Sequence, residues 1–539
     1  MTGPISGAGT LETVAAVDPH DGEHGADSGL AFTLQYAVPG MVGAAVLAIG
    51  ALGVGWIPLN GLADVPLVHA LRDTGVGVVV SRASVILGGA LLLQAWLVVG
   101  GDVLAGHVRD IRRLWGVLAL WMVPMLLMPP LFSRDAYSYF AQGKLLLSGV
   151  DPYHNGVSSI PGWLNAGVDP MWQNTPTPYG PLFLSLSRGI AAVVGDDVGW
   201  APTFAAIAFR VLALVGVGLL AFYVPRLAFH HGIDGTKALW LGGMNPLVLM
   251  HFVAGAHNDA LMVGLMVAGL CLAVEHRFIA GTLLVAGAGM IKPIGFLALP
   301  FVGLLWAGMS SSFGRRVVAW LKTGGVALVA LVGLSAIVGV GPGWVRALTT
   351  PGEVRTWLSP STALGMSTGN LLDWFGLGDH TDLAVAAFRI AFMLAAITIV
   401  LRLILAPAGR SPVRGTMYAF LAVVLLGPVV QVWYLLWALP LAAATGLRPR
   451  QLKWVLLAIA AFTLYGLCET SATADSLIRF SQVVAMIGAF AAVGIAVSVS
   501  PRERQLLFGA DVEHGLVPED APAQARRDRL VFRGREAAA

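Results

Sequence analysis

The sequence predicts an all-α protein that crosses a membrane many times, and three features support this. Of the 539 residues, 57% are hydrophobic and 12% are charged, which is about half the charge of an ordinary soluble domain. The mean hydropathy is +0.77. The apolar residues form runs close to the ~20 residues that a membrane helix needs. The basic residues lie in short loops between these runs, which argues against a nucleic-acid partner.

The two ends of the chain are polar, unlike the body between them. We expect residues 1–35 and 501–539 to be cytoplasmic tails, the first disordered and the second rich in arginine, with one membrane domain over residues 36–500. No basic stretch precedes the first apolar run, which argues against a cleaved signal peptide. Cys271 and Cys468 both lie inside apolar runs, so we expect neither a disulfide nor a cysteine-bound metal.

The apolar runs predict about 14 crossings. The expected spans lie near residues 36–57, 77–100, 114–132, 203–225, 238–255, 259–275, 279–291, 294–308, 318–341, 383–405, 415–429, 431–446, 452–467 and 478–499.

Arginine and lysine set the expected orientation, because they collect in loops on the cytoplasmic side. The basic clusters share one side only if residues 180–195, with Arg188 at the middle, do not cross. We therefore predict an interfacial helix there and both termini in the cytoplasm. Two long loops, near residues 133–202 and 342–382, then face outward. Long loops in a compact membrane protein are usually functional.

The first outer loop opens with an acid at the mouth of a span. Asp135 lies in the run SRDAYSY (133–139), and a helix is expected over residues 136–147. One interpretation is a carboxylate that pairs with Arg134 or caps this helix. The other is a general base that removes a proton from a hydroxyl at the water–lipid boundary.

A second polar group, His257-Asn258-Asp259, is expected at a tight turn between two spans. Turn chemistry would explain it, with Asp259 beginning the next helix. Ionisable residues at membrane depth also indicate function, and His257 would then donate to a phosphate or orient a hydroxyl. A divalent metal shared with Asp135 is conceivable. No ligand spacing supports one, so we expect no metal and no other cofactor.

Three cations lie in otherwise apolar surroundings. Lys292 stands between two apolar runs, where it either extends its ammonium to the interface or binds an anion. Arg210 and Arg389 lie about two turns inside the outer ends of their spans. Each therefore needs a partner, either an acidic lipid headgroup or an acid such as Asp382 or Asp475.

Aromatic residues crowd another outer hairpin, QVWYLLW (431–437). Tryptophan and tyrosine at this depth usually belong to the interfacial belt of a membrane protein. Their faces also suit stacking on sugar rings.

Taken in order, the motifs SRDAYSY, GVDPY, YGPL, GAHNDA, IKP and QVWYLLW resemble those of the polyprenol-phosphate-mannose-dependent α-1,6-mannosyltransferases of mycobacteria and corynebacteria. The resemblance covers most of residues 36–500. It implies the GT-C glycosyltransferase fold, a multi-helix membrane body whose long first extracytoplasmic loop carries an essential aspartate. Asp135 matches that aspartate by position. Many relatives have two adjacent acids there, whereas this chain has one between Arg134 and Ala136, which favours a metal-independent site.

The resemblance also implies a reaction at the outer face of a bacterial plasma membrane. Mannose would pass from a polyprenyl-phosphate-mannose donor to the 6-hydroxyl of a mannosylated glycolipid acceptor, with inversion. The product would be the α-1,6-mannan core of lipomannan and lipoarabinomannan. Asp135 would be the base. The donor phosphate would be bound by Lys292, Arg134, His257, Arg210 and Arg389. The substrates would contact Tyr137, Tyr153, His154, Asn258, Asp259, Gln431, Trp433 and Tyr434.

Other functions stay open on the sequence. A similar scaffold can transfer arabinose or glucose. A polyprenyl-lipid transporter or flippase would place polar residues at the membrane midplane, whereas here they lie at one end. A membrane acyl- or phosphotransferase would need a histidine paired with an acid, for which His257 and Asp259 are the candidates. A structural subunit without activity would leave Lys292 and Asp135 unexplained.

Overall fold

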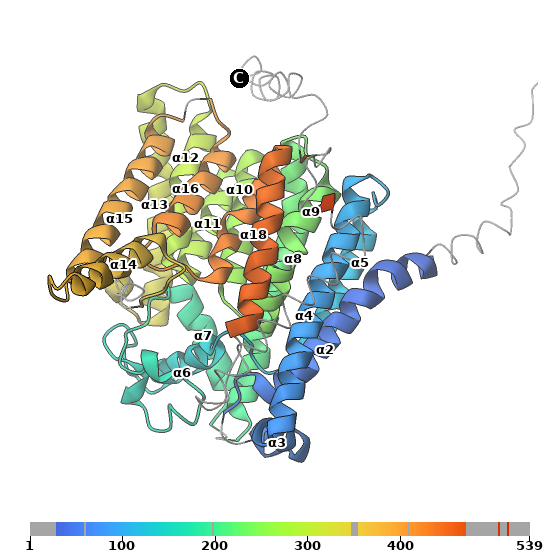
Figure 1. Ribbon diagram of the computed structural model, residues 1–539. Coiled ribbons are helices and arrows are strands. Elements are labelled where there is room, and N and C mark those ends of the chain that lie inside the picture. The colour runs from blue at the N-terminus through green and yellow to red at the C-terminus, as the bar shows by residue number, and fades with distance from the viewer. Residues whose placement is uncertain are drawn as a thin grey trace, which may run out of the picture.

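The computed structural model describes residues 29–58, 61–196, 199–345, 354–407, 409–469, 505–506 and 515–516. Within these residues the chain is helical, with no β-strand and one isolated bridge between Leu447 and Leu516. Long helices stand side by side, and the shorter helices α3, α6 and α7 gather at one end of them (Figure 1). The predicted all-α class is confirmed for the described part of the chain.

Among the described residues, five helices are long and apolar enough to cross a membrane. A bent pair, η6 (Val248–Ala254) with α10 (Asp259–Val274), makes a sixth if its two halves, which are bent by 114° relative to each other, form one span. The five are Gly29–Val54, which contains η1 (Thr33–Ala37) and α2 (Val38–Val54), α4 (Gly75–Leu104), α8 (Ala201–His230), α13 (Phe313–Val338) and α15 (Thr381–Leu405).

Most of the other predicted spans are shorter helices, so the count of about 14 crossings stays a prediction. The run predicted at 478–499 lies outside the described residues. The shorter helices in these spans are α5 (Ile111–Met122), α9 (Gly235–Gly243), α11 (Phe278–Ile291), η7 (Pro293–Ala298), α12 (Leu299–Ala307), α16 (Pro412–Leu426), η9 (Val432–Trp437), α17 (Leu439–Thr445) and α18 (Pro449–Glu469).

Two predicted spans are interrupted where proline removes a backbone donor. The span expected at 114–132 stops being helical after η3 (Val123–Met125), and Pro129 and Pro130 follow outside any helix. The span expected at 238–255 breaks at Met244 and Asn245, directly before Pro246, between α9 and η6. The Asn245 side chain satisfies backbone groups on both sides of this break, since it donates to the Leu241 carbonyl and accepts from the Val248 N–H.

The two predicted outer loops contain helices. The helix expected at 136–147 is present as α6 (Asp135–Leu147), and residues 180–195 form α7 (Pro181–Val194) as predicted. Two short turns, η4 (Val157–Ser159) and η5 (Pro170–Trp172), lie between them. Three helices were not predicted from the sequence: α14 (Pro360–Trp374) in the second loop, and η2 (Gly61–Asp64) and α3 (Pro66–Asp73) before α4.

The helices pack closely where small residues face each other, as membrane helices do. A Cβ atom on Gly88 of α4 would lie 2.4 Å from the Leu47 nitrogen of α2, and one on Gly50 of α2 would lie 2.5 Å from the Ser81 oxygen of α4. Glycine at these positions therefore lets α2 and α4 touch through their backbones.

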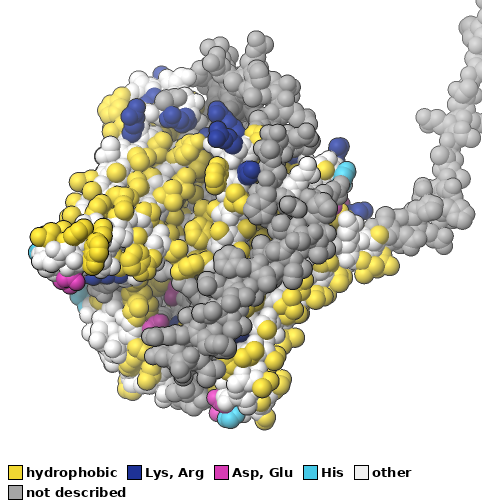
Figure 2. Space-filling view, in the orientation of Figure 1, with side chains coloured by type: hydrophobic (Ala, Val, Ile, Leu, Met, Phe, Trp, Pro, Cys, Tyr) yellow, Lys and Arg dark blue, Asp and Glu magenta, His cyan; other side chains and the backbone are white. Residues whose placement is uncertain are grey.

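The surface separates into an apolar flank and a basic end. Hydrophobic side chains cover most of the described part of the flank in Figure 2, and lysine and arginine gather at the upper end, opposite α6 and α7. Helices α13 and α15 expose apolar side chains such as Val329, Ile337 and Leu383. Exposed apolar helices of this length indicate a multi-pass membrane protein.

Candidate active site

Four separate segments bring polar side chains together at the end of the molecule that carries α6 and α7. They are the start of α6, the turn between η6 and α10, the residue after α11, and η9. The group formed by Asp135, His257, Asn258, Asp259, Lys292, Trp433, Tyr434 and Trp437 is called the polar cluster below.

Asp135 is the first residue of α6 and the more accessible acid of the cluster. Its side chain is 25% exposed, and its Oδ2 lies 3.3 Å from Nδ1 of the fully buried His257. The Tyr139 hydroxyl, one turn along α6, donates to the same oxygen at 3.2 Å. Burial alone would raise the pKa of Asp135, but His257, Ser133 and the Lys292 charge outweigh burial, so this pKa lies below its ordinary value. The carboxyl is therefore ionised near neutral pH.

Asp259 is the first residue of α10 and, unlike Asp135, is closed off from solvent. Its side chain is fully buried, and the Lys292 ammonium lies 2.9 Å from both of its oxygens. The Trp437 indole donates to Asp259 Oδ1 at 2.6 Å. The ammonium also lies 5.2 Å from the Tyr434 ring centre and 5.4 Å from that of Trp437. Both oxygens of Asp259 are thus already engaged.

The Lys292 ammonium can still bind a ligand although it is paired with Asp259. An ammonium has three N–H donors, and the two Asp259 oxygens account for two of them. The Lys292 side chain is 17% exposed. Its remaining donor can therefore bind an anion that reaches the cluster.

Two residues close in sequence to Asp135 and His257 have a left-handed backbone conformation. Phe132, with φ 69°, comes three residues before Asp135, and Ala256, with φ 53°, comes immediately before His257. Such a conformation costs roughly 1–3 kcal/mol at a residue other than glycine and persists only where the surroundings enforce it. Strain of this kind concentrates at functional sites.

Arg210 of α8 helps to enforce this backbone. The guanidinium is completely buried and donates to the carbonyls of Val253, Ala254 and Leu126 at 3.0, 3.2 and 2.8 Å. Val253 and Ala254 lead into the turn that carries His257. Arg210 therefore holds the turn in position through its backbone, and its partners are backbone carbonyls rather than the acids considered from the sequence. Of those acids, Asp382 pairs with Arg355 at 2.6 Å, and Asp475 lies outside the described residues.

Several buried polar atoms around His257 have no protein partner in the described part of the chain. They are both side-chain amide atoms of Asn258, the Trp433 indole nitrogen and both ring nitrogens of His251. The Trp433 ring stacks on His257, with ring centres 4.1 Å apart. A buried polar atom without a partner is costly, roughly 1–3 kcal/mol. These atoms are suited to a ligand rich in hydroxyl groups.

Apart from Gln431, whose backbone carbonyl accepts from the Tyr434 N–H, the other predicted site residues make their side-chain contacts outside the polar cluster. The Arg134 guanidinium lies 3.9 Å from the Trp56 ring centre, so Asp135 pairs with His257 and the Arg134–Asp135 pair considered from the sequence does not form. Gln431 precedes η9 as its N-terminal cap residue. The remaining contacts join Tyr137 to the Trp56 carbonyl, Tyr153 to the Tyr179 carbonyl, His154 to Asp151, and Arg389 to the Thr362 hydroxyl and the Val354 carbonyl.

Sequence reasoning missed Tyr139 and Trp437, and each had a signal. Tyr139 follows Asp135 by four residues, which places both on the same face of one helix turn. Trp437 ends the aromatic run at 431–437, and its role depends on the distant Asp259. Only Tyr139 was therefore within reach of a local argument.

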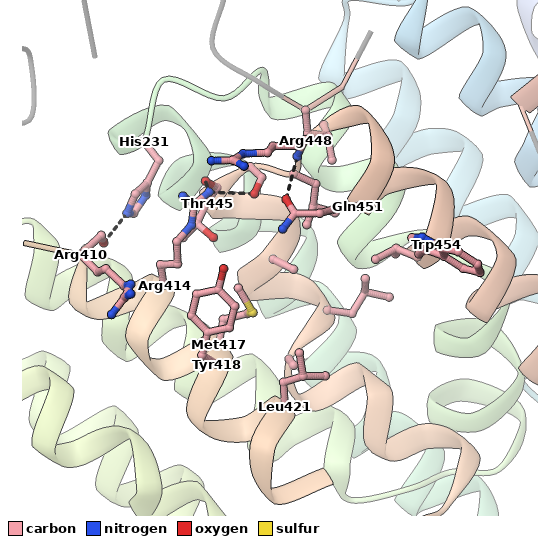
Figure 3. Close-up of a pocket in the computed structure, with 18 of the residues that line it drawn as sticks. His231, Arg410, Arg414, Met417, Tyr418, Leu421, Thr445, Arg448, Gln451 and Trp454 are labelled. Atoms are coloured by element: carbon pink, nitrogen blue, oxygen red, sulfur yellow. Dashed lines mark hydrogen bonds between the residues drawn. The ribbon is translucent and has the colours of Figure 1, made fainter. Parts of the chain in front are cut away.

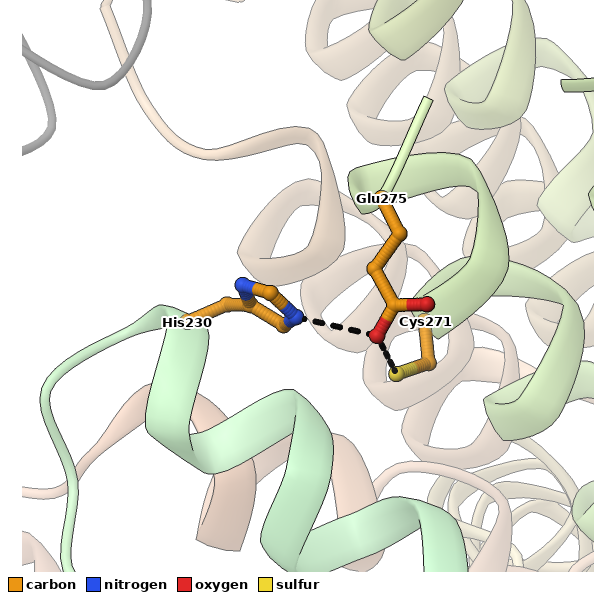
Figure 4. A group of neighbouring side chains, drawn as sticks. All are labelled: His230, Cys271 and Glu275. Carbon is orange, nitrogen blue, oxygen red and sulfur yellow. Dashed lines mark hydrogen bonds and ion pairs between the residues drawn. The ribbon is translucent and has the colours of Figure 1, made fainter. Parts of the chain in front are cut away.

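A second titratable cluster lies at the basic end, where α8 and α10 finish. His230, Cys271 and Glu275 bring ligand-type atoms within 4.8 Å of one another (Figure 4). Arg226, however, donates to both oxygens of Glu275, at 2.5 and 2.8 Å. This carboxylate already has a bidentate cationic partner. The cluster therefore works as an ion pair that joins α8 to α10.

Comparison with known proteins gives a consistent result along the chain. Residues 37–308 match the N-terminal domain of the α-(1→6)-mannopyranosyltransferases, and residues 361–500 match the MptB C-terminal domain. A probable α-(1→6)-mannopyranosyltransferase of Mycolicibacterium smegmatis is 33% identical, over 90% of this chain and 91% of that protein. α-(1→6)-Mannopyranosyltransferase A of Mycobacterium tuberculosis is 35% identical over 75% and 79%, and α-(1→6)-mannopyranosyltransferase B of Corynebacterium glutamicum is 30% identical over 75% and 72%. No solved structure matches the chain.

The fold and these matches define the class as a multi-pass membrane glycosyltransferase. The chain belongs to the α-(1→6)-mannopyranosyltransferase family. The family resemblance found in the sequence is thereby confirmed.

Proposed function

We propose that this protein is an inverting mannosyltransferase of the GT-C fold, with Asp135 as its catalytic base. The donor is polyprenyl-phosphate-mannose, and the acceptor is the 6-hydroxyl of an α-1,6-linked mannan on a glycolipid, the precursor of lipomannan and lipoarabinomannan. The observation that carries the proposal is the contrast between the two acids of the cluster. Asp135 is ionised and partly exposed, whereas both oxygens of Asp259 are engaged.

Asp135 acts on the acceptor. Its carboxylate takes the proton from the acceptor O6 as that oxygen attacks C1 of the donor mannose. The new O6–C1 bond forms while the bond from C1 to the phosphate oxygen breaks, and the electron pair stays on the phosphate. A positioned base of this kind contributes about 10²–10⁴-fold to the rate. His257 and Tyr139 hold the carboxylate oxygen that would otherwise rotate.

The leaving phosphate gains negative charge and needs a cation more than an acid. Lys292 supplies that charge through the donor not engaged by Asp259, and a fixed cation stabilises charge that develops in the transition state. Asp259 and Trp437 keep Lys292 in one position. No step in this scheme requires a metal ion, and the site is proposed to be metal-independent.

Trp433, Tyr434 and Asn258 are proposed to bind the sugars. Trp433 and Tyr434 offer aromatic faces, and the unpartnered Asn258 amide offers both a donor and an acceptor. The polar cluster is proposed to face the outside of a bacterial plasma membrane, because the basic loops lie at the other end of the molecule and mark the cytoplasmic side.

The test is transfer of radiolabelled mannose in membranes that contain the full chain. Polyprenyl-phosphate-[¹⁴C]mannose is offered with a short α-1,6-linked mannose acceptor. We expect transfer by the native chain and a loss of about 10²–10⁴-fold in Asp135→Asn. Asp196→Asn, in the same loop, is the matched control and should keep its activity, since Asp196 is 92% exposed and pairs with Lys144, outside the polar cluster.

Each other outcome has a definite meaning. Full activity in a folded Asp135→Asn variant would remove Asp135 as the base. No transfer by the native chain from this donor, but transfer from polyprenyl-phosphate arabinose or glucose, would keep the scaffold and change the sugar. Movement of the lipid-linked sugar across the membrane without transfer would instead support a flippase.

A further inference from the structure

A cavity opens at the basic end of the molecule, away from the polar cluster. It has a volume of about 810 Å³ and lies between α16, α17 and the start of α18, with His231 at one side (Figure 3). This volume falls in the range that holds a ligand of several hundred daltons. Nothing in the proposed transfer reaction uses it.

The rim of the cavity is cationic. Arg410, Arg414 and Arg448 all line it, and no acidic residue is among its described lining residues. Arg414 donates to the carbonyls of Thr445 and Gly446 at the end of α17, so its charge is held in place. No contact within the described part of the chain engages the guanidinium groups of Arg410 and Arg448, which leaves their donors available to an anion.

The walls of the cavity are apolar, in contrast to the rim. Met417 and Leu421 of α16, Leu435 of η9 and Val455 of α18 line the cavity, and the Trp454 indole stands at its edge. A free phosphate ion gains nothing from such walls. Hydrocarbon attached to a phosphate gains by leaving water, at roughly 25 cal/mol per Å² buried.

We propose that this cavity binds one anionic phospholipid, with its phosphate between Arg410 and Arg448 and an acyl chain along the α16 wall. Arginine matches the geometry of a phosphate through paired N–H donors. A basic pocket between membrane helices on the cytoplasmic side is where acidic headgroups bind. The inference rests on the cavity alone and holds whether or not the protein transfers mannose.

The experiment is native mass spectrometry of the full chain in detergent, with phosphatidylglycerol or phosphatidylcholine added. We expect one phosphatidylglycerol to stay bound and phosphatidylcholine to bind far more weakly. The double variant R410Q/R448Q should bind phosphatidylglycerol about 30-fold more weakly, because each arginine near an anionic lipid contributes roughly fivefold. The matched control is R315Q/R316Q, which removes one exposed and one half-buried arginine at the start of α13, outside the cavity.

A second measurement on the native chain keeps the test independent of how the variants fold. Phosphatidylglycerol should raise the thermal unfolding midpoint, and neither phosphatidylcholine nor inorganic phosphate should do so. Equal stabilisation by inorganic phosphate would show a phosphate site rather than a lipid site. Equal binding of the two lipids, or equal loss in both arginine pairs, would overturn the proposal.

Discussion

Asp135 and Asp259 begin two helices at the same end of the molecule, yet their surroundings differ. Asp135 is a quarter exposed, and two neutral or weakly basic groups approach one of its oxygens. Asp259 is fully buried, and an ammonium and an indole engage both of its oxygens. The first arrangement leaves a carboxylate able to accept a proton, and the second fixes a cation in place. Two identical side chains thus have different functions because of what surrounds each.

The largest expected effect comes from breaking the buried ion pair between Asp259 and Lys292. Asp259→Asn leaves the Lys292 ammonium buried without a counter-charge, which should lower the free energy of unfolding by about 3–5 kcal/mol. Asp382→Asn breaks the exposed pair with Arg355 and should cost no more than about 1 kcal/mol. Thermal unfolding of both variants in detergent checks the difference. If both variants lose a similar free energy of unfolding, the Asp259–Lys292 pair stabilises the fold no more than an exposed ion pair does.

A smaller effect is expected from Trp437→Phe, which keeps the ring and removes the N–H donor to Asp259. A hydrogen bond to a charged group contributes about 1.5–3 kcal/mol, and the free energy of unfolding should fall by that amount. Trp374→Phe, at an exposed tryptophan, is the control and should change little. If Trp437→Phe unfolds like the native chain, Lys292 alone holds Asp259.

The mildest change concerns the pH dependence of activity. The pKa of Asp135 is lowered, so the base stays ionised and kcat/KM should fall only as pH drops below the ordinary range of an aspartate. His257→Gln removes a group that lowers this pKa, so the acidic limb of the profile should move to higher pH. His69→Gln, at an exposed histidine in α3, should leave the limb unchanged. If the acidic limb stays at the same pH in a folded His257→Gln variant, His257 does not set the pKa of the catalytic base.

Part of the site could be predicted from local sequence. The helix that begins at Asp135, the helix that begins at Asp259 and the isolated Lys292 all appear where the sequence placed them. These features depend on hydropathy, turn residues and charge within a few positions, which a single sequence displays. The sequence also placed the acids, the histidine and the aromatic run at one end of the molecule, which the polar cluster confirms.

The partners of these residues could not be predicted in the same way. Lys292 and Asp259 are 33 positions apart, and Trp437 is 178 positions from Asp259. Arg210 was expected to pair with an acidic lipid headgroup or an acid, but it donates to three backbone carbonyls instead, two at the end of η6 and one just after η3. Such contacts arise only when helices pack, because packing decides which polar groups leave water together.

By itself, the sequence determined that this is a helical membrane protein of the α-(1→6)-mannopyranosyltransferase family with its polar residues at one end. Hydrophobic runs, basic loops and ordered motifs are local, and each acts over a short length of chain. Only the tertiary structure decided that Asp135 is the open acid and Asp259 the closed one, and that the cavity at the other end combines arginines with an apolar wall. Exposure and charge pairing belong to the packed molecule, since residues far apart in sequence set the solvation of each group.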